Sequence, residues 1–324
     1  MKLRRIGVMT SGGDAPGMNA AVRAAYRMAR HLGLEIVAIR DGYQGLLNGQ
    51  VEPLDTHKVD GIERLGGTIL GTSRSVEFRT PQGVERSLRQ LDRHNIEGLV
   101  VVGGEGSLKG AYSLHQRGYG VVGVPASIDN DVGGTDVAIG VDTAVNTALD
   151  AIDKLKDTAA AFHRAFVVEV MGRQSGWIAL QAAIGGGAEM VLIPEVPFEI
   201  EDVVRRMKEV QASGKTHFLL VVAEGCKPSA AEISDAISKR DDVEFESRLT
   251  VLGHIQRGGS PFTFDRYLAA RLSLKAVEEL AGGRSGSVVG LRATKIAATP
   301  IESAVNEPSP FNSETHRFAE ILAG

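Results

Sequence analysis

The chain has 324 residues, of which 43% are hydrophobic, and a formal net charge of −4 at pH 7. This length suits two domains with a sizeable core, and the slightly negative charge argues against general nucleic-acid binding. The single cysteine, Cys226, excludes an internal disulfide and a cysteine-based metal cage. No apolar run approaches the roughly 20 residues that span a bilayer, and no signal-peptide stretch precedes the first expected strand, so we expect a cytoplasmic protein without membrane contacts.

Short apolar runs alternate with helical patterns, which is typical of an α/β fold with largely parallel sheets. The expected strands are Arg5–Thr10, Glu35–Ile39, Gly98–Val102, Gly120–Val124, Ala165–Val170, Met190–Ile193 and Phe218–Ala223. The expected helices are Asn19–His31, Gly83–His94, Thr143–Ala160, Ile200–Ser213 and Phe264–Leu280. The first four strands form one half of the chain and the next three a second half, and Ser287–Leu291 is expected to return to the first half. We therefore predict two lobes with a cleft between them.

A glycine-rich turn, Gly12–Asn19, follows the first expected strand and opens a helix. Glycines allow a ligand to approach the backbone closely, and a helix N-terminus favours an anion. The turn is neither a dinucleotide fingerprint nor a P-loop, because no lysine-serine pair follows it. Such turns are as often purely structural, so this one alone indicates no particular ligand.

A second glycine-rich turn, Gly103–Ser107, carries a carboxylate at Glu105. Backbone N–H groups of the glycines can approach phosphates, and the carboxylate can hold a divalent ion. A solvated loop carboxylate is the alternative. We favour the magnesium ion of a nucleotide, because another acidic loop follows the neighbouring strand.

That acidic loop is Pro125–Asp131, where proline ends a strand and leaves Ser127, Asp129 and Asp131 beyond its carboxyl end. Ligands of open α/β sheets bind at this edge. Two carboxylates in different surroundings can divide the work, one accepting a proton and one lying near a metal. Asp-Asn-Asp is also a good turn sequence, so a structural turn remains the alternative.

The second half of the chain supplies positive charge through Arg164, Arg173, Arg248, His254 and Arg257. Arginine suits bidentate recognition of phosphate. A lone surface arginine is usually only solvated and a lone histidine usually structural, but several such residues beside glycines at strand ends favour an anion site. A further basic stripe, formed by arginines at helical spacing, is either a solvated helix face or an anion site at a subunit boundary: Arg23, Arg27 and Arg30.

Taken together, these motifs closely resemble those of the bacterial ATP-dependent 6-phosphofructokinases, over nearly the whole chain and less clearly after about residue 290. The most specific segments are Thr10–Asn19, Gly66–Leu70, Pro125–Asp131, Glu169–Arg173 and Leu252–Pro261. The resemblance implies two Rossmann-like three-layer αβα lobes and transfer of the γ-phosphoryl of MgATP to the 1-hydroxyl of fructose 6-phosphate, a step of glycolysis. It assigns ATP to residues 1–140 plus about 256–305, and the sugar phosphate and effectors to 141–255 plus about 306–324.

The resemblance also implies residue roles. Asp129 would be the general base, with Asp131 beside it, and Ser127 and Arg173 would hold the moving phosphoryl group. Residues around ATP would be Gly13, Arg74, Ser75, Gly104, Glu105, Gly106, Ser107 and Gly110, with Mg²⁺ held by Glu105 and Asp131. Residues around the sugar phosphate would be Ser127, Asp129, Arg164, Met171, Gly172, Arg173, Glu224, Arg248, His254 and Arg257. Arg164 and Arg248 would reach the sugar phosphate of a neighbouring subunit, which implies a homotetramer.

Small residues at two positions bear on the phosphoryl donor. Pyrophosphate-using relatives carry aspartate at the position of Gly106 and lysine at that of Ala126, so ATP is expected here. Glu105 and Ser127 stand where the family usually has aspartate and threonine. These departures leave open a non-catalytic or weakly active regulatory subunit of the family. A kinase for another sugar phosphate, or one that uses pyrophosphate as donor, is a separate alternative.

An effector site for ADP or phosphoenolpyruvate is implied by Arg23, Arg27, Lys156, Gly187, Glu189, Lys215 and His217. Lys156 and Ser213 replace arginines that are usual in the family, and Thr216 replaces a usual lysine. Each charge-assisted hydrogen bond is worth about 1.5–3 kcal/mol. We therefore expect a blunted response to these effectors.

Overall fold

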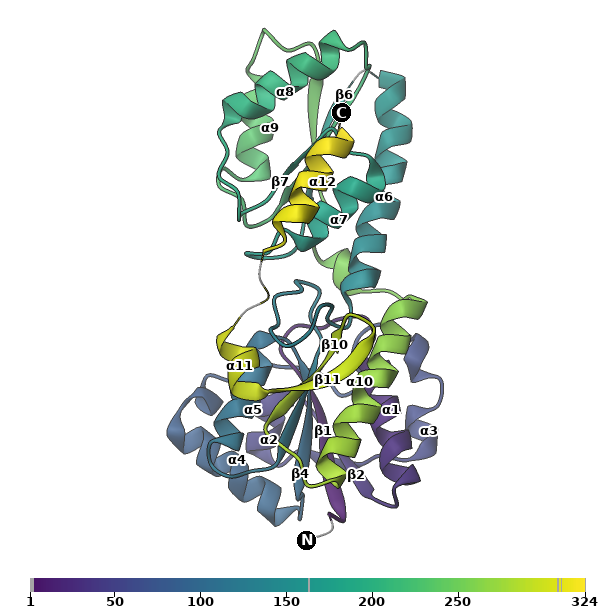
Figure 1. Ribbon diagram of the computed structural model, residues 1–324, viewed down its shortest axis with the longest axis vertical. Helices are drawn as coiled ribbons and strands as arrows, with labels where there is room; N and C mark the ends of the chain where they lie inside the picture. Colours follow the sequence, from purple (N-terminus) through teal and green to yellow (C-terminus); the bar gives the residue numbers. More distant parts are fainter. Residues whose placement is uncertain (1–2, 163, 308, 310, 324) are drawn as a thin grey trace. The chain divides into compact units, whose positions relative to one another are not determined.

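The computed structural model describes residues 3–162, 164–307, 309 and 311–323. The chain forms two compact units, each with its own β-sheet and its own covering helices (Figure 1). Unit 1 comprises Met1–Asp142 and Arg257–Ser309, and unit 2 comprises Thr143–Gln256 and Pro310–Gly324.

Unit 1 is built on a seven-stranded sheet in the order β11-β10-β5-β4-β1-β2-β3. Its strands are β1 (Arg5–Ser11), β2 (Glu35–Ile39), β3 (Val51–Pro53), β4 (Gly98–Gly103), β5 (Val121–Pro125), β10 (Ser287–Arg292) and β11 (Lys295–Pro300). The strands from β10 to β2 are mutually parallel, and β3 and β11 are antiparallel edge strands. β4 and β5 are buried throughout, as expected for parallel strands with both faces covered.

Helices cover both faces of this sheet. They are α1 (Met18–His31), α2 (Gly42–Asn48), α3 (Thr56–Val59), α4 (Pro81–Arg93), α5 (Glu105–His115), α10 (Thr263–Ala281) and α11 (Ile301–Asn306), with 3₁₀ turns η1 (Ile62–Arg64) and η2 (Glu77–Arg79). α1 and α10 pack together on one face, and α4, α5 and α11 lie on the other (Figure 1). The sheet therefore forms the middle layer of three, with its core between strand and helix side chains such as Val101 and Leu108.

Unit 2 has a four-stranded parallel sheet in the order β7-β8-β6-β9. Its strands are β6 (Arg164–Val170), β7 (Met190–Leu192), β8 (Phe218–Ala223) and β9 (Glu246–Val251). Its helices are α6 (Val141–Phe162), α7 (Trp177–Gly186), α8 (Ile200–Ala212), α9 (Ala230–Ser238) and α12 (Ser313–Ala323). The 3₁₀ turn η3 (Gly253–Arg257) follows β9 along the chain. α12, from the C-terminal part of the chain, packs on α7 and β7 (Figure 1).

The predicted α/β architecture with largely parallel sheets is confirmed, and so is the return of β10 to the first sheet, where it pairs with β5. The sequence did not predict β9, which alternates charged and apolar residues in Glu246–Val251, or the short antiparallel edges β3 and β11. It also did not predict α5, because Gly106 and Gly110 are poor helix formers. Tertiary packing of the α5 face that bears Leu108 and Leu114 overrides that local preference.

Candidate active site

Three turns of unit 1 meet at the carboxyl edge of its sheet. Ser11 at the end of β1 pairs with Gly103 at the end of β4, and Gly103 pairs in turn with Pro125 at the end of β5. The N–H of Ala126 donates to the carbonyl of Gly103 at 3.0 Å. The glycine-rich turns and the acidic loop that the sequence singled out are therefore direct neighbours.

The turn after β1 requires glycine for its shape. Gly12 and Gly17 have φ angles of 90° and 103°, in the left-handed region, and Gly17 is the N-cap of α1. A Cβ at Gly13 would clash with the guanidinium of Arg257, which lies 3.5 Å from the carbonyl oxygen of Asp14. The sequence assigned Gly13 to ATP and Arg257 to the sugar phosphate, and the structure shows them side by side within unit 1.

The second glycine turn forms the start of α5. Gly104 is the N-cap and offers no side-chain oxygen to the helix, so the N-terminal end of α5 can face an anion. Ser107 is buried, and its hydroxyl lies 2.8 Å from where a Cβ at Gly12 would stand. Glu105 lies in the first turn and pairs with Lys109 one turn later at 2.5 Å, with 41% of its side chain exposed.

The acidic loop after β5 is held by hydrogen bonds of its own side chains. Asp129 is only 3% exposed, and its N–H donates to the hydroxyl of Ser127 at 3.2 Å. That hydroxyl is also 3.3 Å from the Asp131 carboxylate, to which it donates. Asn130 adopts a left-handed φ of 52° and accepts from the N–H of Ala138 at 2.8 Å. The loop is therefore an ordered turn that buries Asp129, so the structural and the functional interpretation of Asp-Asn-Asp are compatible.

Glu105 and Asp131 stand on adjacent turns, because a Cβ at Gly104 would lie only 3.3 Å from the Cβ of Ser127. In the described part of the chain, no three His, Cys, Asp or Glu side chains gather as a metal cage. Mg²⁺ in phosphoryl-transfer sites commonly takes one or two carboxylates, with phosphate and water oxygens completing its shell. The two carboxylates therefore fit a magnesium ion whose other ligands are phosphate and water oxygens.

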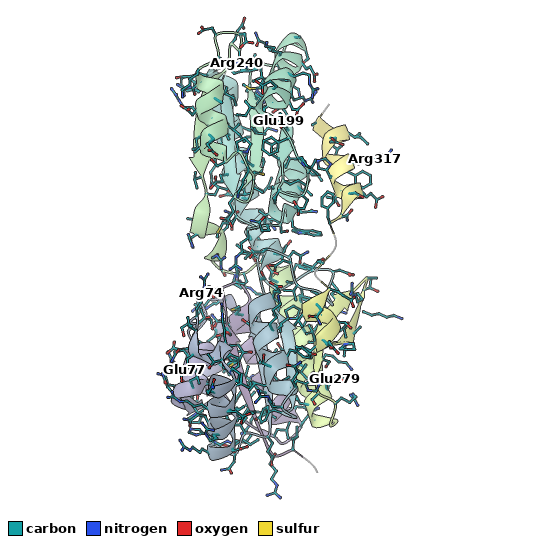
Figure 2. The ribbon with its side chains drawn as sticks, turned by 90° about the vertical axis from the view of Figure 1, so that its left-hand side faces the viewer. Arg74, Glu77, Glu199, Arg240, Glu279 and Arg317 are labelled. Atoms are coloured by element: carbon teal, nitrogen blue, oxygen red, sulfur yellow. The ribbon has the colours of Figure 1, made fainter. Side chains whose placement is uncertain are left out.

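Arg74 and Ser75 follow an irregular segment that is tied to the first glycine turn. The hydroxyl of Thr72 donates to the carbonyl of Gly12 at 2.7 Å, and that of Thr10 to the carbonyl of Gly71 at 2.9 Å. Ser75 accepts from the N–H of Phe78 at 3.2 Å. The side chain of Arg74 is exposed and extends outward from unit 1 (Figure 2).

Tyr43 is a residue of this site that sequence reasoning missed. Its hydroxyl donates to the carbonyl of Ser107 at 2.6 Å, and its ring stacks on Phe78 with centroids 3.9 Å apart. A Cβ at Gly110 would lie 2.5 Å from the ring, so Gly110 permits this close packing. Burial raises the pKa of Tyr43 well above its ordinary value, which keeps the hydroxyl protonated as a donor. No motif surrounds Tyr43, so no sequence signal pointed to it.

In unit 2 a sharp turn after β6 contains Met171, Gly172 and Arg173. Arg173 adopts a left-handed φ of 54°, which is uncommon for a residue other than glycine. The carboxylate of Glu224 accepts from its N–H at 2.8 Å and from that of Gly172 at 3.3 Å. A Cβ at Gly225 would clash with the carbonyl of Arg173. The segment after β8 thus fixes the turn after β6.

Two groups beside this turn, the half-buried Glu169 and the buried Cys226, have shifted pKa values. Burial, and then the charge of Glu224, raise the pKa of Glu169. Burial raises the pKa of the Cys226 thiol to about 12, so the thiol stays protonated at neutral pH. Cys226 is 3% exposed, as is common for an inert structural cysteine.

Further arginines lie along β6 and β9. Arg164 pairs with Glu246 at 3.0 Å and lies 4.5 Å from the centroid of the Phe162 ring. Arg248 forms an ion pair with the same carboxylate of Glu246. His254 is exposed in η3. The parallel pairing of β6 with β9 brings Arg164 and Arg248 together, which sequence spacing alone could not show.

The residues expected at an effector site fall into two sets. In unit 1, Arg23 pairs with Glu63 at 3.1 Å and Arg27 with Asp60 at 3.9 Å. The unit 2 set consists of Lys156, Gly187, Glu189, Lys215 and His217. There, Lys156 donates to the carbonyl of Gly186 at 2.7 Å and more weakly to that of Gly187 at 3.4 Å. Lys215 pairs at 3.2 Å with the buried carboxylate of Glu189.

Comparison with known proteins shows the class to which this fold and site belong. The model of the family described as Phosphofructokinase matches residues 5–280. The chain therefore belongs to the phosphofructokinase family, and the resemblance noted in its motifs is confirmed. In the described part of the chain, no helix combines the length and the apolar surface needed to cross a membrane.

The curated relatives are more specific. An ATP-dependent 6-phosphofructokinase 1 from Thermus thermophilus is 49% identical over 323 residues, covering 99% of this chain and all of that protein. The ATP-dependent 6-phosphofructokinases of Thermotoga neapolitana and Shouchella clausii are 48% and 47% identical, also over 99% of this chain and their whole length.

Two solved structures support the fold. A phosphofructokinase from Saccharomyces cerevisiae has a TM-score of 0.86 and 33% identity over 99% of this chain, which spans 48% of that longer chain. A pyrophosphate-dependent phosphofructokinase from Marinobacter aquaeolei has a TM-score of 0.84 at 20% identity, covering 99% of this chain and 92% of its own. The latter likeness concerns the fold alone.

Proposed function

We propose that this chain transfers the γ-phosphoryl group of ATP to the 1-hydroxyl of fructose 6-phosphate in the cytoplasm, as a step of glycolysis. Full-length relatives at 47–49% identity that are named ATP-dependent 6-phosphofructokinase support the activity. The observation that carries the proposal is the junction in unit 1. There a buried carboxylate, Asp129, lies on the turn next to two glycine-rich turns that suit phosphate groups.

We assign ATP to residues 1–140 plus about 256–305. The glycines after β1 and β4 bring N–H groups close to the phosphates, and the N-terminal end of α5 adds a favourable partial charge. Glu105 and Asp131 would hold Mg²⁺, which neutralises phosphate charge when it is bound with ATP. Arg74 would reach the nucleotide from its exposed position.

Asp129 is the proposed base. Its carboxylate would accept the proton of the sugar 1-hydroxyl as that oxygen attacks the γ-phosphorus. The hydroxyl of Ser127, which accepts from the N–H of Asp129 and donates to the carboxylate of Asp131, would turn to donate to the transferred group. A serine in place of the usual threonine keeps that donor.

We assign the sugar phosphate to residues 141–255 plus about 306–324, together with Arg257. Proposed ligands are Arg164, Met171, Gly172, Arg173, Glu224, Arg248, His254 and Arg257. In a homotetramer, Arg164 and Arg248 would serve a neighbouring subunit and would leave Glu246 to do so. For the effector residues we propose a blunted response, because Lys156 and Ser213 stand where the family usually has arginines and Thr216 where it usually has a lysine.

The open space beside Gly106 supports ATP rather than pyrophosphate as the phosphoryl donor. A Cβ at Gly106 would meet no atom of the described chain within 4 Å, which leaves room beside the α5 N-terminus for a larger donor. Ala126 is 1% exposed, and no lysine amine stands there to grip pyrophosphate.

Assays that follow consumption of the donor and formation of the sugar bisphosphate test the proposal, with ATP or pyrophosphate as donor and a panel of hexose phosphates as acceptors. We expect turnover with ATP and fructose 6-phosphate that depends on Mg²⁺. Binding of both ligands without turnover would instead identify a non-catalytic subunit. Turnover with pyrophosphate or with another sugar phosphate alone would replace the assignment of donor or acceptor.

A further inference from the structure

The segment that carries Arg74 has little structure of its own. Residues 65–76, between η1 and η2, form neither helix nor strand. Such a segment cannot satisfy its backbone N–H and C=O groups internally, so other parts of the chain or water must do so. The position of Arg74 therefore depends on the side chains that hold this segment.

Among the side chains that hold this segment, Asn19 makes more hydrogen bonds to it than any other. It is the second residue of α1 and is 1% exposed. Its amide nitrogen donates to the carbonyls of Leu65 at 3.0 Å and Gly67 at 2.8 Å, and its amide oxygen accepts from the N–H of Ile69 at 2.8 Å. One buried amide thus binds three backbone groups within five residues.

Other bonds tie the segment to the turn after β1 and to the residues after β2. The hydroxyl of Ser73 donates to the carbonyl of Asp41 at 3.0 Å, and the N–H of Asp41 donates to the carbonyl of Leu70 at 2.9 Å. The carboxylate of Asp14 accepts from the N–H of Thr68 at 3.1 Å, and the hydroxyls of Thr10 and Thr68 are 2.8 Å apart. A Cβ at Gly66 would clash with the carbonyl of Gly259, so the segment also lies directly against the chain beyond η3. The segment is therefore fixed onto the first glycine turn, with Asn19 at its centre.

We propose that Asn19 is a positioning residue for nucleotide binding, which holds residues 65–69 beside the turn after β1 and thereby keeps the segment that leads to Arg74 close to that turn. This inference rests on the proposed function. Asn19 touches no reactant in this role, because its amide is buried and its bonding groups are engaged with the segment. It acts through Arg74, and its loss lowers nucleotide affinity rather than the rate of the chemical step.

Asn19→Asp tests the role with minimal change of shape. Aspartate keeps the oxygen that accepts from Ile69 but places a second oxygen against the carbonyls of Leu65 and Gly67. Leaving buried acceptors unpaired costs about 1–3 kcal/mol, so we expect KM for ATP to rise roughly tenfold or more. KM for fructose 6-phosphate and kcat at saturating ATP should change less than threefold. Equal losses in both KM values, or an unchanged KM for ATP, overturn the proposal.

Tyr119→Phe is the matched control. Its hydroxyl also donates to a backbone carbonyl of unit 1, that of Ile96, but just before β5, at the opposite end of the strand from the acidic loop. Both variants lose a side-chain donor to a backbone carbonyl. A change in kinetics that comes only from reduced stability should therefore appear in both variants. Only Asn19→Asp is expected to change KM for ATP. If Asn19→Asp does not fold, Asn19→Ser, which introduces no charge, takes its place.

A double-mutant cycle separates positioning from general structure. If Asn19 acts through Arg74, adding Asn19→Asp to Arg74→Ala should raise KM for ATP less than twofold beyond Arg74→Ala alone. Fully additive effects would mean that Asn19 does not act through Arg74.

Hydrogen exchange gives a readout that does not need the kinase activity. In Asn19→Asp, amides of residues 65–75 should exchange faster, while those of β4 and β5 keep their protection. If the wild-type protein shows no phosphofructokinase activity, the proposed function fails, and direct titration with ATP, with and without Asn19→Asp, still decides the role of Asn19. Unchanged exchange over residues 65–75 would overturn it.

Discussion

The glycine-rich turns and the acidic loop of unit 1 differ from the arginine-bearing edge of unit 2 in the kind of side chain and in how it is held. In unit 1 the candidate residues are glycines and short side chains, held by backbone pairing and largely buried, as at Gly103, Ser107 and Asp129. In unit 2 they are mostly long, charged side chains with solvent access, already paired with carboxylates, as for Arg164 and Arg248 with Glu246.

This contrast indicates how each region would respond to change. Groups fixed by the backbone are preorganised, so little reorganisation is needed when a ligand binds, but a small steric change disturbs the fold itself. Exposed ion pairs contribute only about 0–1 kcal/mol, so exchanging one for a ligand phosphate costs little. Substitutions in the glycine-rich turns and the acidic loop should therefore affect rate and stability, and those at the arginine-bearing edge of unit 2 mainly affinity.

The largest effect is expected at Asp129. Asp129→Asn keeps the size of the side chain but removes the proposed base, and general-base help is typically worth about 10²–10⁴ in rate. We expect kcat to fall by at least 10², with the dissociation constant for ATP changed by less than about threefold, measured by steady-state assay and by calorimetry. A variant with wild-type turnover would show that another group accepts the proton.

Two neighbouring glycines test the steric part of the comparison. A Cβ at Gly103 would clash with the carbonyl of Ser11 and lie 2.7 Å from the Cβ of Ser107, whereas one at Gly106 would meet nothing within 4 Å. Gly103→Ala should destabilise the protein by about 1–3 kcal/mol, as overpacking in tight sites usually does. Gly106→Ala is the matched control and should unfold in urea at nearly the wild-type midpoint. Equal midpoints for both variants would contradict this view of the β1–β4 junction.

Low pH should reduce the folding stability of unit 1 through Glu279, which lies in α10 (Figure 2). Hydrogen bonds from Arg284, and then from Lys275, lower the pKa of Glu279 from 4.5 to about 2. Because the folded pKa lies below the unfolded one, its contribution is fully present above pH 4.5 and is lost as the pH falls towards 2. Glu279→Gln should cost about 1–3 kcal/mol at pH 7, and the difference from wild type should shrink in urea unfolding at low pH. A constant difference would argue against the ion pairs.

Glu169 of unit 2 should respond with the opposite sign. Its pKa is raised by burial and by Glu224, so the folded state binds its proton more tightly than the unfolded state does. The stability that this gives is present below pH 4.5 and is lost as the pH rises through the raised pKa. Glu169→Gln should therefore unfold at a higher urea concentration than wild type at pH 7 and show no such gain at pH 4. A loss of stability at pH 7 would show that the charged form is favoured.

The smallest effect is expected at Glu246. Glu246→Gln removes the charge that pairs with Arg164 and Arg248. If these arginines bind the sugar phosphate, KM for fructose 6-phosphate should fall by a factor of about two to five, which corresponds to less than about 1 kcal/mol. KM for ATP serves as the internal control and should not change. A rise in KM for the sugar phosphate would mean that Glu246 orients the arginines rather than competing for them.

The sequence predicted the elements with long apolar runs or clear helical periodicity within one or two residues, as for β4, β5 and α8. It did not predict β9, where charged residues interrupt the apolar pattern, or α5, where glycines hide a buried helix. Among site features, Tyr43 and Asn19 were not identified as functional, because each acts through backbone groups far away in the chain. The roles assigned to individual residues stay predictions until the variants are measured.

The sequence by itself determined the α/β architecture and the family, because strand periodicity and glycine-rich motifs are local and survive without knowledge of contacts. Only the tertiary structure decided which turns are neighbours. Parallel pairing of β1 with β4 joins segments about ninety residues apart, and pairing of β6 with β9 places two arginines on one carboxylate. Such contacts follow from strand order and register, which depend on the packing of the whole sheet rather than on any single segment.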